Sequence, residues 1–139
     1  MADIERILIK IRELEGYQEE LFSILPDNQE DFLQNIEKQR ATERILQIMI
    51  ECVIDICYML NKELHNGPPP DEEAVFDFLS DKIDNIEIIK KMKGFRNILV
   101  HRYGKVNSKL VFQFAKRNVG DFNAFISEVN RLLDNIFSR

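Results

Sequence analysis

Residues that make turns and crosslinks are scarce in this chain of 139 residues. It has no tryptophan, five glycines and four prolines, three of them adjacent, which is too few turn residues for a protein of many short strands. The two cysteines, Cys52 and Cys57, lie in a helical pattern, where five residues rise about 7.5 Å. That rise exceeds the usual disulfide separation of under about 7 Å. We therefore expect a few long helices and two buried free thiols, as in a reducing cytoplasm.

Long hydrophobic runs are also missing, although 45% of the residues are apolar. No run approaches the roughly 18 residues of a membrane span, and the charged start, Met1 to Arg6, has no apolar signal core. The length suits one domain over residues 1–139 that buries a core without disulfides or metal. We expect a cytoplasmic protein that has no membrane association, no bound metal and no cofactor.

Acidic residues are absent between Ile88 and Gly120, although the whole chain has a net charge of −5. This stretch has a charge of +9, while the remainder, with ten basic and 24 acidic residues, has a charge of −14. Its nine basic residues are Lys90, Lys91, Lys93, Arg96, Arg102, Lys105, Lys109, Lys116 and Arg117. Two interpretations stay open: a binding site for a polyanion, or a basic helix face that pairs with acidic neighbours in the fold.

Apolar residues recur at helical spacing in four long segments, and no strand pattern competes. The spacing predicts long helices over residues 3–25, 30–65, 85–104 and 119–137, and short helices over residues 72–82 and 108–116. Asp71, Asp84 and either Asn107 or Ser108 are the expected N-caps, and Gly67 suits the C′ position after the second helix. The sequence therefore predicts an all-α, up-and-down four-helix bundle with additional short helices.

The second long helix is apolar on most faces between Ile45 and Leu60, which predicts burial on more than one side. Cover by a second copy of the chain, a homodimer, is one way to achieve this. One polar stripe at i, i+4 spacing interrupts the helix, namely Glu43, Gln47, Glu51 and Asp55. This stripe faces either water or a basic group inside the protein, Arg96 or Arg102, which its carboxylates would hold in position.

The segment from Gly94 to Gly104 gathers the side chains that proton transfer and phosphate binding need. His101 titrates near neutral pH and can act as a general acid or base. Arg96 offers a planar fork of donors that stabilises charge on a phosphate. Because RNA has its own nucleophile, the 2′-hydroxyl group, these two side chains suffice for cleavage without metal. The alternative is a helix end whose polar side chains only cap carbonyls and pack against neighbours.

Helical geometry limits how these side chains meet. On a regular helix Asn97 and His101 share a face, whereas Tyr103 points about 160° away from His101. Asn97 can orient the imidazole or donate to phosphate, and Tyr103 can stack on a base. Arg96, His101 and Tyr103 converge only if the helix unwinds before Gly104 or a second subunit completes the site.

The residues from Arg96 to Tyr103 match the R-x4-H-x-Y motif of the HEPN superfamily. The flanking Gly94, Phe95 and Val106, the helix over residues 39–56 and the proline loop resemble the HepT branch of toxins. The resemblance implies a dimeric helical bundle and a metal-independent endoribonuclease, the toxin of a type VII-like toxin–antitoxin pair. It also implies a partner, an MntA-like minimal nucleotidyltransferase antitoxin, which transfers AMP from ATP to the motif tyrosine.

Transferred to this sequence, the resemblance makes Arg96 and His101 catalytic, Asn97 a supporting residue and Tyr103 the site of AMPylation. Relatives often have an acidic residue between the histidine and the tyrosine, where this chain has a basic one.

That basic residue, Arg102, together with Lys105 makes the segment more basic and favours RNA binding. Three functions stay open: a toxin ribonuclease, a non-catalytic subunit that binds nucleotide or docks a nucleotidyltransferase, and a purely structural helical dimer.

Overall fold

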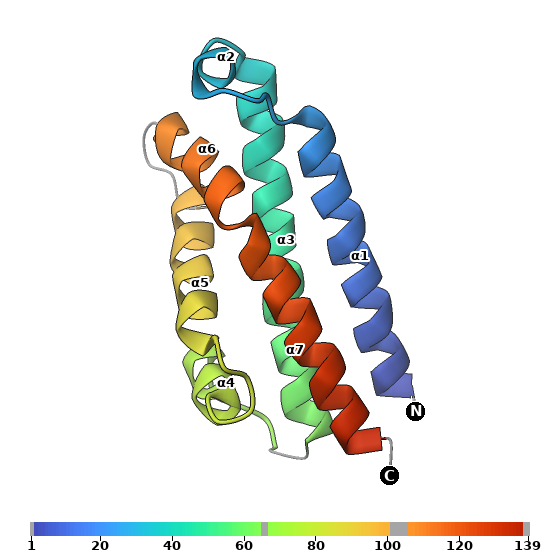
Figure 1. The fold of residues 1–139 in the computed structure, drawn as a ribbon. Helices are drawn as coiled ribbons and strands as arrows, with labels where there is room; N and C mark the ends of the chain where they lie inside the picture. The colour runs from blue at the N-terminus through green and yellow to red at the C-terminus, as the bar shows by residue number, and fades with distance from the viewer. Residues whose placement is uncertain (1, 65–66, 101–105, 138–139) are drawn as a thin grey trace.

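Four long helices lie side by side in the computed structural model, which describes residues 2–64, 67–100 and 106–137 (Figure 1). The long helices are α1 (Ala2–Ile24), α3 (Ile36–Glu63), α5 (Ile86–Val100) and α7 (Val119–Phe137). The short helices α2 (Gln29–Leu33), α4 (Glu72–Leu79) and α6 (Ser108–Arg117) occupy the connections. The described ranges contain no strand, so the predicted all-α bundle with additional short helices is confirmed.

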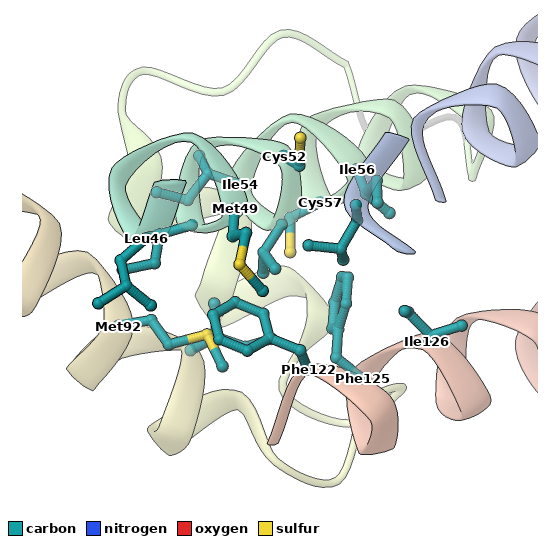
Figure 2. Packing of buried hydrophobic residues seen from close by; sticks show 14 of the residues in the cluster. Leu46, Met49, Cys52, Ile54, Ile56, Cys57, Met92, Phe122, Phe125 and Ile126 are labelled. Atoms are coloured by element: carbon teal, nitrogen blue, oxygen red, sulfur yellow. The ribbon is translucent and has the colours of Figure 1, made fainter. Parts of the chain in front are cut away.

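Helix α3 lies at the centre of the core and contacts α1, α2, α4, α5 and α6. Its side chains from Ile45 to Leu60 are mostly buried. Figure 2 shows Phe122 and Phe125 of α7 beside the buried side chains of α3. The apolar faces of α3 are thus covered by the same chain, so the argument that a second subunit must cover them is wrong. The homodimer stays a prediction without that support.

The second long helix was expected to start near residue 30, but the structure divides it into α2 and α3. Asn28 caps α2, since its Oδ1 accepts the Asp31 N–H at 2.8 Å, and Asn35 caps α3 in the same way toward Lys38 at 3.0 Å. An asparagine in extended conformation breaks the helix because its side chain replaces the missing carbonyl acceptor. Asn35 marks the boundary between α2 and α3, which the hydrophobic pattern does not show because it continues across this residue.

Other predicted helix ends are also corrected. Helix α3 ends at Glu63 with Leu64 as its C-cap, so Gly67 is not the C′ residue, although its φ of 70° lies in the left-handed region. The short helix α4 ends at Leu79, before the predicted residue 82. Asp71 and Asn107 are N-caps as predicted.

Asp84 makes no N-cap hydrogen bond to α5 within the described ranges. Its N–H donates instead to the carboxylate of Glu128 on α7 at 2.6 Å, and the Asn85 side chain donates to the same carboxylate at 3.1 Å. The buried carboxylate of Glu128 therefore ties the start of α5 to α7, and this contact helps to position the helix that carries the motif.

Cys52 and Cys57 are both buried free thiols, as the spacing predicted. Burial raises the pKa of Cys52 to about 11 and also raises the pKa of Cys57. Both thiols therefore stay protonated at neutral pH and are poor nucleophiles.

Within the described ranges, no helix combines the length and the apolar character that a membrane span requires.

Candidate functional site

Arg96 lies on the side of α5 that faces α4, and its guanidinium is held on two sides. Nη2 donates to both carboxylate oxygens of Glu72, at 3.1 and 3.3 Å, and Nε donates to the Asn97 Oδ1 at 3.1 Å. The side chain of Arg96 is 16% exposed and that of Glu72 is 24% exposed, so water screens this pair only partly. Among the described residues, no hydrogen bond or ion pair to Nη1 is found. The guanidinium is therefore fixed in place and presents its Nη1 edge for a further acceptor.

Glu72 is the residue that the sequence did not reveal. It lies in the first turn of α4, directly after the N-cap Asp71, whose Oδ1 accepts the Ala74 N–H at 2.9 Å. Glu72 also lies 3.5 Å from the Nζ of Lys93, one helical turn before Arg96 on α5. An acidic residue in a first turn ordinarily complements the helix dipole, so nothing local linked Glu72 to a residue 24 positions later.

The acidic stripe of α3 does not supply the carboxylate that holds Arg96. Glu43 is buried and accepts from Arg40 at 2.6 Å, Glu51 accepts from Gln47 at 3.2 Å, and the exposed Asp55 lies 3.7 Å from the Nζ of Lys10. The alternative in which the stripe holds Arg96 is therefore wrong, and Glu72 has that position, while the alternative in which it holds Arg102 stays a prediction because Arg102 lies outside the described residues. The stripe does not simply face water either, because it runs from buried Glu43 to exposed Asp55.

Four of the predicted site residues lie outside the described residues: His101, Arg102, Tyr103 and Lys105. The structure brings together the other two, Arg96 and Asn97, and describes α5 as far as Val100, which directly precedes the histidine. Val106 and Asn107 are the next described residues, immediately before α6. The predicted convergence of Arg96, His101 and Tyr103 stays a prediction.

The structure divides the +9 stretch into two electrostatic parts. On α5, Lys90 lies within 4 Å of Glu73, Asp77 and Glu87, and both Lys93 and Arg96 pair with Glu72. These three cations are neutralised mainly by α4, as one of the two interpretations stated. On α6 the exposed cations are Lys109, Lys116 and Arg117, and none pairs with a carboxylate among the residues that the structure describes. Among the described residues, the second interpretation, a polyanion site, therefore rests on α6 and on the exposed Lys91, while Arg102 and Lys105 lie outside those residues.

Tyr58 of α3 connects the Arg96 region to a cavity of about 700 Å³ at the end of α3. The pKa of the Tyr58 hydroxyl is raised, because burial and the nearby carboxylate of Glu72 outweigh the opposing charges of Lys93 and Arg96. Pro68 and Pro69 line the other side of this largely apolar cavity. The proline loop thus forms a wall next to the site, in addition to ending the helix.

No group of three or more histidine, cysteine, aspartate or glutamate side chains in the described ranges is arranged to hold a metal ion. His101 lies outside those ranges.

Comparison with known proteins shows which class of helical protein this bundle resembles. The structure superposes with a TM-score of 0.81 on a HEPN toxin from Shewanella oneidensis, solved in tri-AMPylated form in complex with an MNT antitoxin. The two chains are 27% identical, and the match covers 90% of this chain and 96% of the toxin. Arg96 and Asn97 thus lie on α5 of a HEPN-type bundle.

The family is shown by the sequence itself. The family model of HepT-like ribonucleases, "Ribonuclease HepT-like", matches residues 7–129. The chain is 29% identical to a tRNA nuclease HepT of Aphanizomenon flos-aquae, with 96% of this chain and 95% of that protein covered. It is also 27% identical to an mRNA nuclease HepT of Shewanella oneidensis, with 93% and 92% covered. The chain belongs to the HepT-like ribonuclease family.

Proposed function

We propose that this protein is the toxin of a type VII-like toxin–antitoxin pair and cleaves RNA without a metal ion, using Arg96 and His101. The observation that carries the proposal is the fixed guanidinium of Arg96, held by Glu72 and Asn97 with Nη1 left for a phosphate oxygen. His101 follows five residues later in the motif, and the chain matches the HepT-like family over residues 7–129.

The reaction needs only one proton acceptor and one cation. His101 takes the proton of the RNA 2′-hydroxyl, and the 2′-oxygen attacks the adjacent phosphorus. A bond forms between the 2′-oxygen and phosphorus while the bond from phosphorus to the 5′-oxygen breaks, and the 5′-oxygen takes up a proton from water. The products are a 2′,3′-cyclic phosphate and a 5′-hydroxyl. Arg96 stabilises the charge that accumulates on the phosphate oxygens.

The proposed partner is an MntA-like minimal nucleotidyltransferase, and the proposed control point is Tyr103. The Tyr103 oxygen attacks the α-phosphorus of ATP, the bond to the β-phosphate breaks, pyrophosphate leaves and the hydroxyl proton is released. The attached AMP adds a bulky anion to the segment that contains Arg96 and His101, and its charge opposes binding of the RNA phosphate. The S. oneidensis relative, AMPylated and in complex with an MNT antitoxin, supports this proposal.

A homodimer in the cytoplasm stays part of the proposal. Ile98 is 56% exposed two residues after Arg96, and Val100 is 42% exposed. Apolar side chains that project into water beside the motif favour cover by a second copy of the chain. That second copy would also complete the site, because Arg96, His101 and Tyr103 of one regular helix do not converge.

The decisive experiment measures cleavage of tRNA and mRNA by the purified protein in excess EDTA, with the His101→Ala variant purified in parallel as the control for contaminating nucleases. We expect cleavage that EDTA does not reduce, 2′,3′-cyclic phosphate ends, and loss of cleavage after treatment with the nucleotidyltransferase and ATP. The Tyr103→Phe variant should keep its activity after that treatment. Cleavage that requires added divalent ions would contradict the metal-independent mechanism, and RNA binding without any cleavage would contradict the proposal and favour the non-catalytic subunit.

Glu72 offers a sharper test of how Arg96 is held. We expect Glu72→Gln to reduce cleavage about tenfold, since a weaker neutral hydrogen bond replaces a charge-assisted pair and lets the guanidinium turn. Glu73→Gln is the matched control, because Glu73 is adjacent on α4 and carries the same charge but, among the described residues, pairs with Lys90 and Lys93 and not with Arg96.

The readout for Glu72→Gln includes the NMR signal of the Arg96 Nε–H, which should shift and exchange faster with water than in the Glu73→Gln protein. A shifted signal with unchanged cleavage would show that the position of the guanidinium does not limit the reaction. Equal loss of activity in both variants would assign the effect to general charge.

A further inference from the structure

The outer face of α6 carries cations that nothing in the described part of the fold neutralises. Lys109, Lys116 and Arg117 are all exposed. With about 100° per residue, these three side chains and Gln113 lie within a sector of about 100° on one side of the helix. The opposite side of α6 is buried through Val111, Phe112 and Ala115. We call Lys109, Gln113, Lys116 and Arg117 the α6 basic face.

Lys90, Lys93 and Arg96 on α5 pair with carboxylates and Lys91 is a single exposed cation on that helix, whereas α6 groups three exposed cations on one face. Lys90 has three carboxylates within 4 Å, whereas the recorded charge contact of Lys116 is with the ring of Phe112, at 5.6 Å. Residues 88–120 contain no aspartate or glutamate, and the next carboxylate along the chain, that of Asp121, accepts a hydrogen bond from Asn118 at 2.9 Å. A group of exposed cations without counter-charges attracts a polyanion more strongly than one already paired.

The α6 basic face also lies next to the motif helix. Phe114 of α6 stacks on Phe95 of α5 with ring centroids 4.2 Å apart, and Phe95 directly precedes Arg96. Beside this stack lies a groove of about 240 Å³, lined by Phe95, Leu110, Gln113, Phe114, Arg117 and Asn118. Leu110 is 53% exposed at the groove. Cations next to exposed apolar and aromatic walls are the combination that binds single strands, whose phosphates meet the charges while a base enters the apolar space.

We infer that the α6 basic face binds the phosphates of a single RNA strand next to the bond that is cleaved, and that the groove between α5 and α6 takes an unpaired base. This inference rests on the proposed ribonuclease function and adds the path of the substrate to it. From Lys109 to Lys116 the helix rises about 10.5 Å, so the face can follow more than one nucleotide of the strand.

The test separates RNA binding from cleavage by using the His101→Ala protein. The affinity of this protein for a mixed-sequence, fluorescein-labelled single-stranded RNA is measured over a range of salt concentrations. Adding Lys109→Gln, Lys116→Gln and Arg117→Gln should weaken binding tenfold to a hundredfold at low salt. The slope of log K against log salt should fall by about 0.7 for each phosphate contact that is lost, about 2 in total. Lys90→Gln is the matched control, because its charge is already neutralised, and it should leave the slope unchanged.

The outcomes distinguish this inference from the function on which it rests. Equal affinity and slope with and without the three substitutions would overturn the α6 inference, as would an equal loss in the Lys90→Gln control. If the three substitutions instead weaken binding of the nucleotidyltransferase and leave RNA binding intact, the face serves a protein partner and the inference is wrong. If the slope falls as expected but the unsubstituted protein never cleaves RNA, the inference stands and the proposed nuclease activity fails. Circular dichroism of the substituted protein confirms that α6 stays folded.

Discussion

Replacement of His101 by alanine is expected to lower the rate of RNA cleavage by about 10²–10⁴-fold, the usual contribution of a general acid or base. The 2′-hydroxyl is a weak acid, so its attack on phosphorus needs a group that accepts the proton near neutral pH. In the sequence, His101 is the motif residue that can do so, and the other histidine, His65, is not part of the motif. Single-turnover rates over a pH series measure the effect. The acid limb of the profile should disappear in the variant.

Arg96→Ala should cost about 10²–10³-fold in the same assay, because the variant loses a fixed donor aimed at the charge of the transition state. Arg96→Lys should recover little, since an ammonium group lacks the planar fork that Glu72 and Asn97 hold in place. Lys90→Ala is the control on the same helix and should stay within a few-fold of the unsubstituted protein. Full activity in folded Arg96→Ala or His101→Ala would refute the assignment of the site.

Replacement of Phe122 by alanine is expected to reduce the free energy of unfolding by about 3–5 kcal/mol, because it opens a cavity in the core. Phe122 is 1% exposed and lies in the core beside α3, as Figure 2 shows. Its ring also meets Phe114 edge-on, with centroids 6.5 Å apart, and Phe114 stacks on Phe95 of the motif helix. The variant therefore loses support for α5 as well as core volume. Urea denaturation followed by circular dichroism gives the change.

Phe22→Ala is the matched control for that measurement. Phe22 lies on α1 and is 60% exposed, so the same chemical change should alter stability by no more than about 0.5 kcal/mol. If the two variants unfold at the same urea concentration, Phe122 is not part of the core that supports the motif helix. RNA cleavage by Phe122→Ala at low temperature, where the protein stays folded, shows how far the packing of α5 affects the site.

The helices were largely predictable because their signals are local. Apolar spacing gave α1 and α7 to within one residue at each end, and the caps Asp71 and Asn107 followed from residue type. The break between α2 and α3 was missed because the hydrophobic pattern continues across Asn35, while its capping hydrogen bond depends on one backbone conformation. A periodicity averaged over many residues does not report a single extended residue.

The covering of α3 could not be predicted from its own composition. A helix that is apolar on most faces requires neighbours, but composition does not say whether they belong to the same chain. The structure provides them from the same chain, with α7 reaching the core of α3 through Phe122 and Phe125. The expectation of a second subunit at α3 failed for that reason.

The sequence by itself determined the class of fold, the family and the motif, because helical spacing and the run from Arg96 to Tyr103 are properties of residues close together in the chain. Only the tertiary structure decided which charges remain available. It paired Arg96 and Lys93 with Glu72, paired Lys90 with Glu73, and left the cations of α6 exposed. The physical reason is that an ion pair depends on distance in space, and α4 and α5 become neighbours only after the chain has folded.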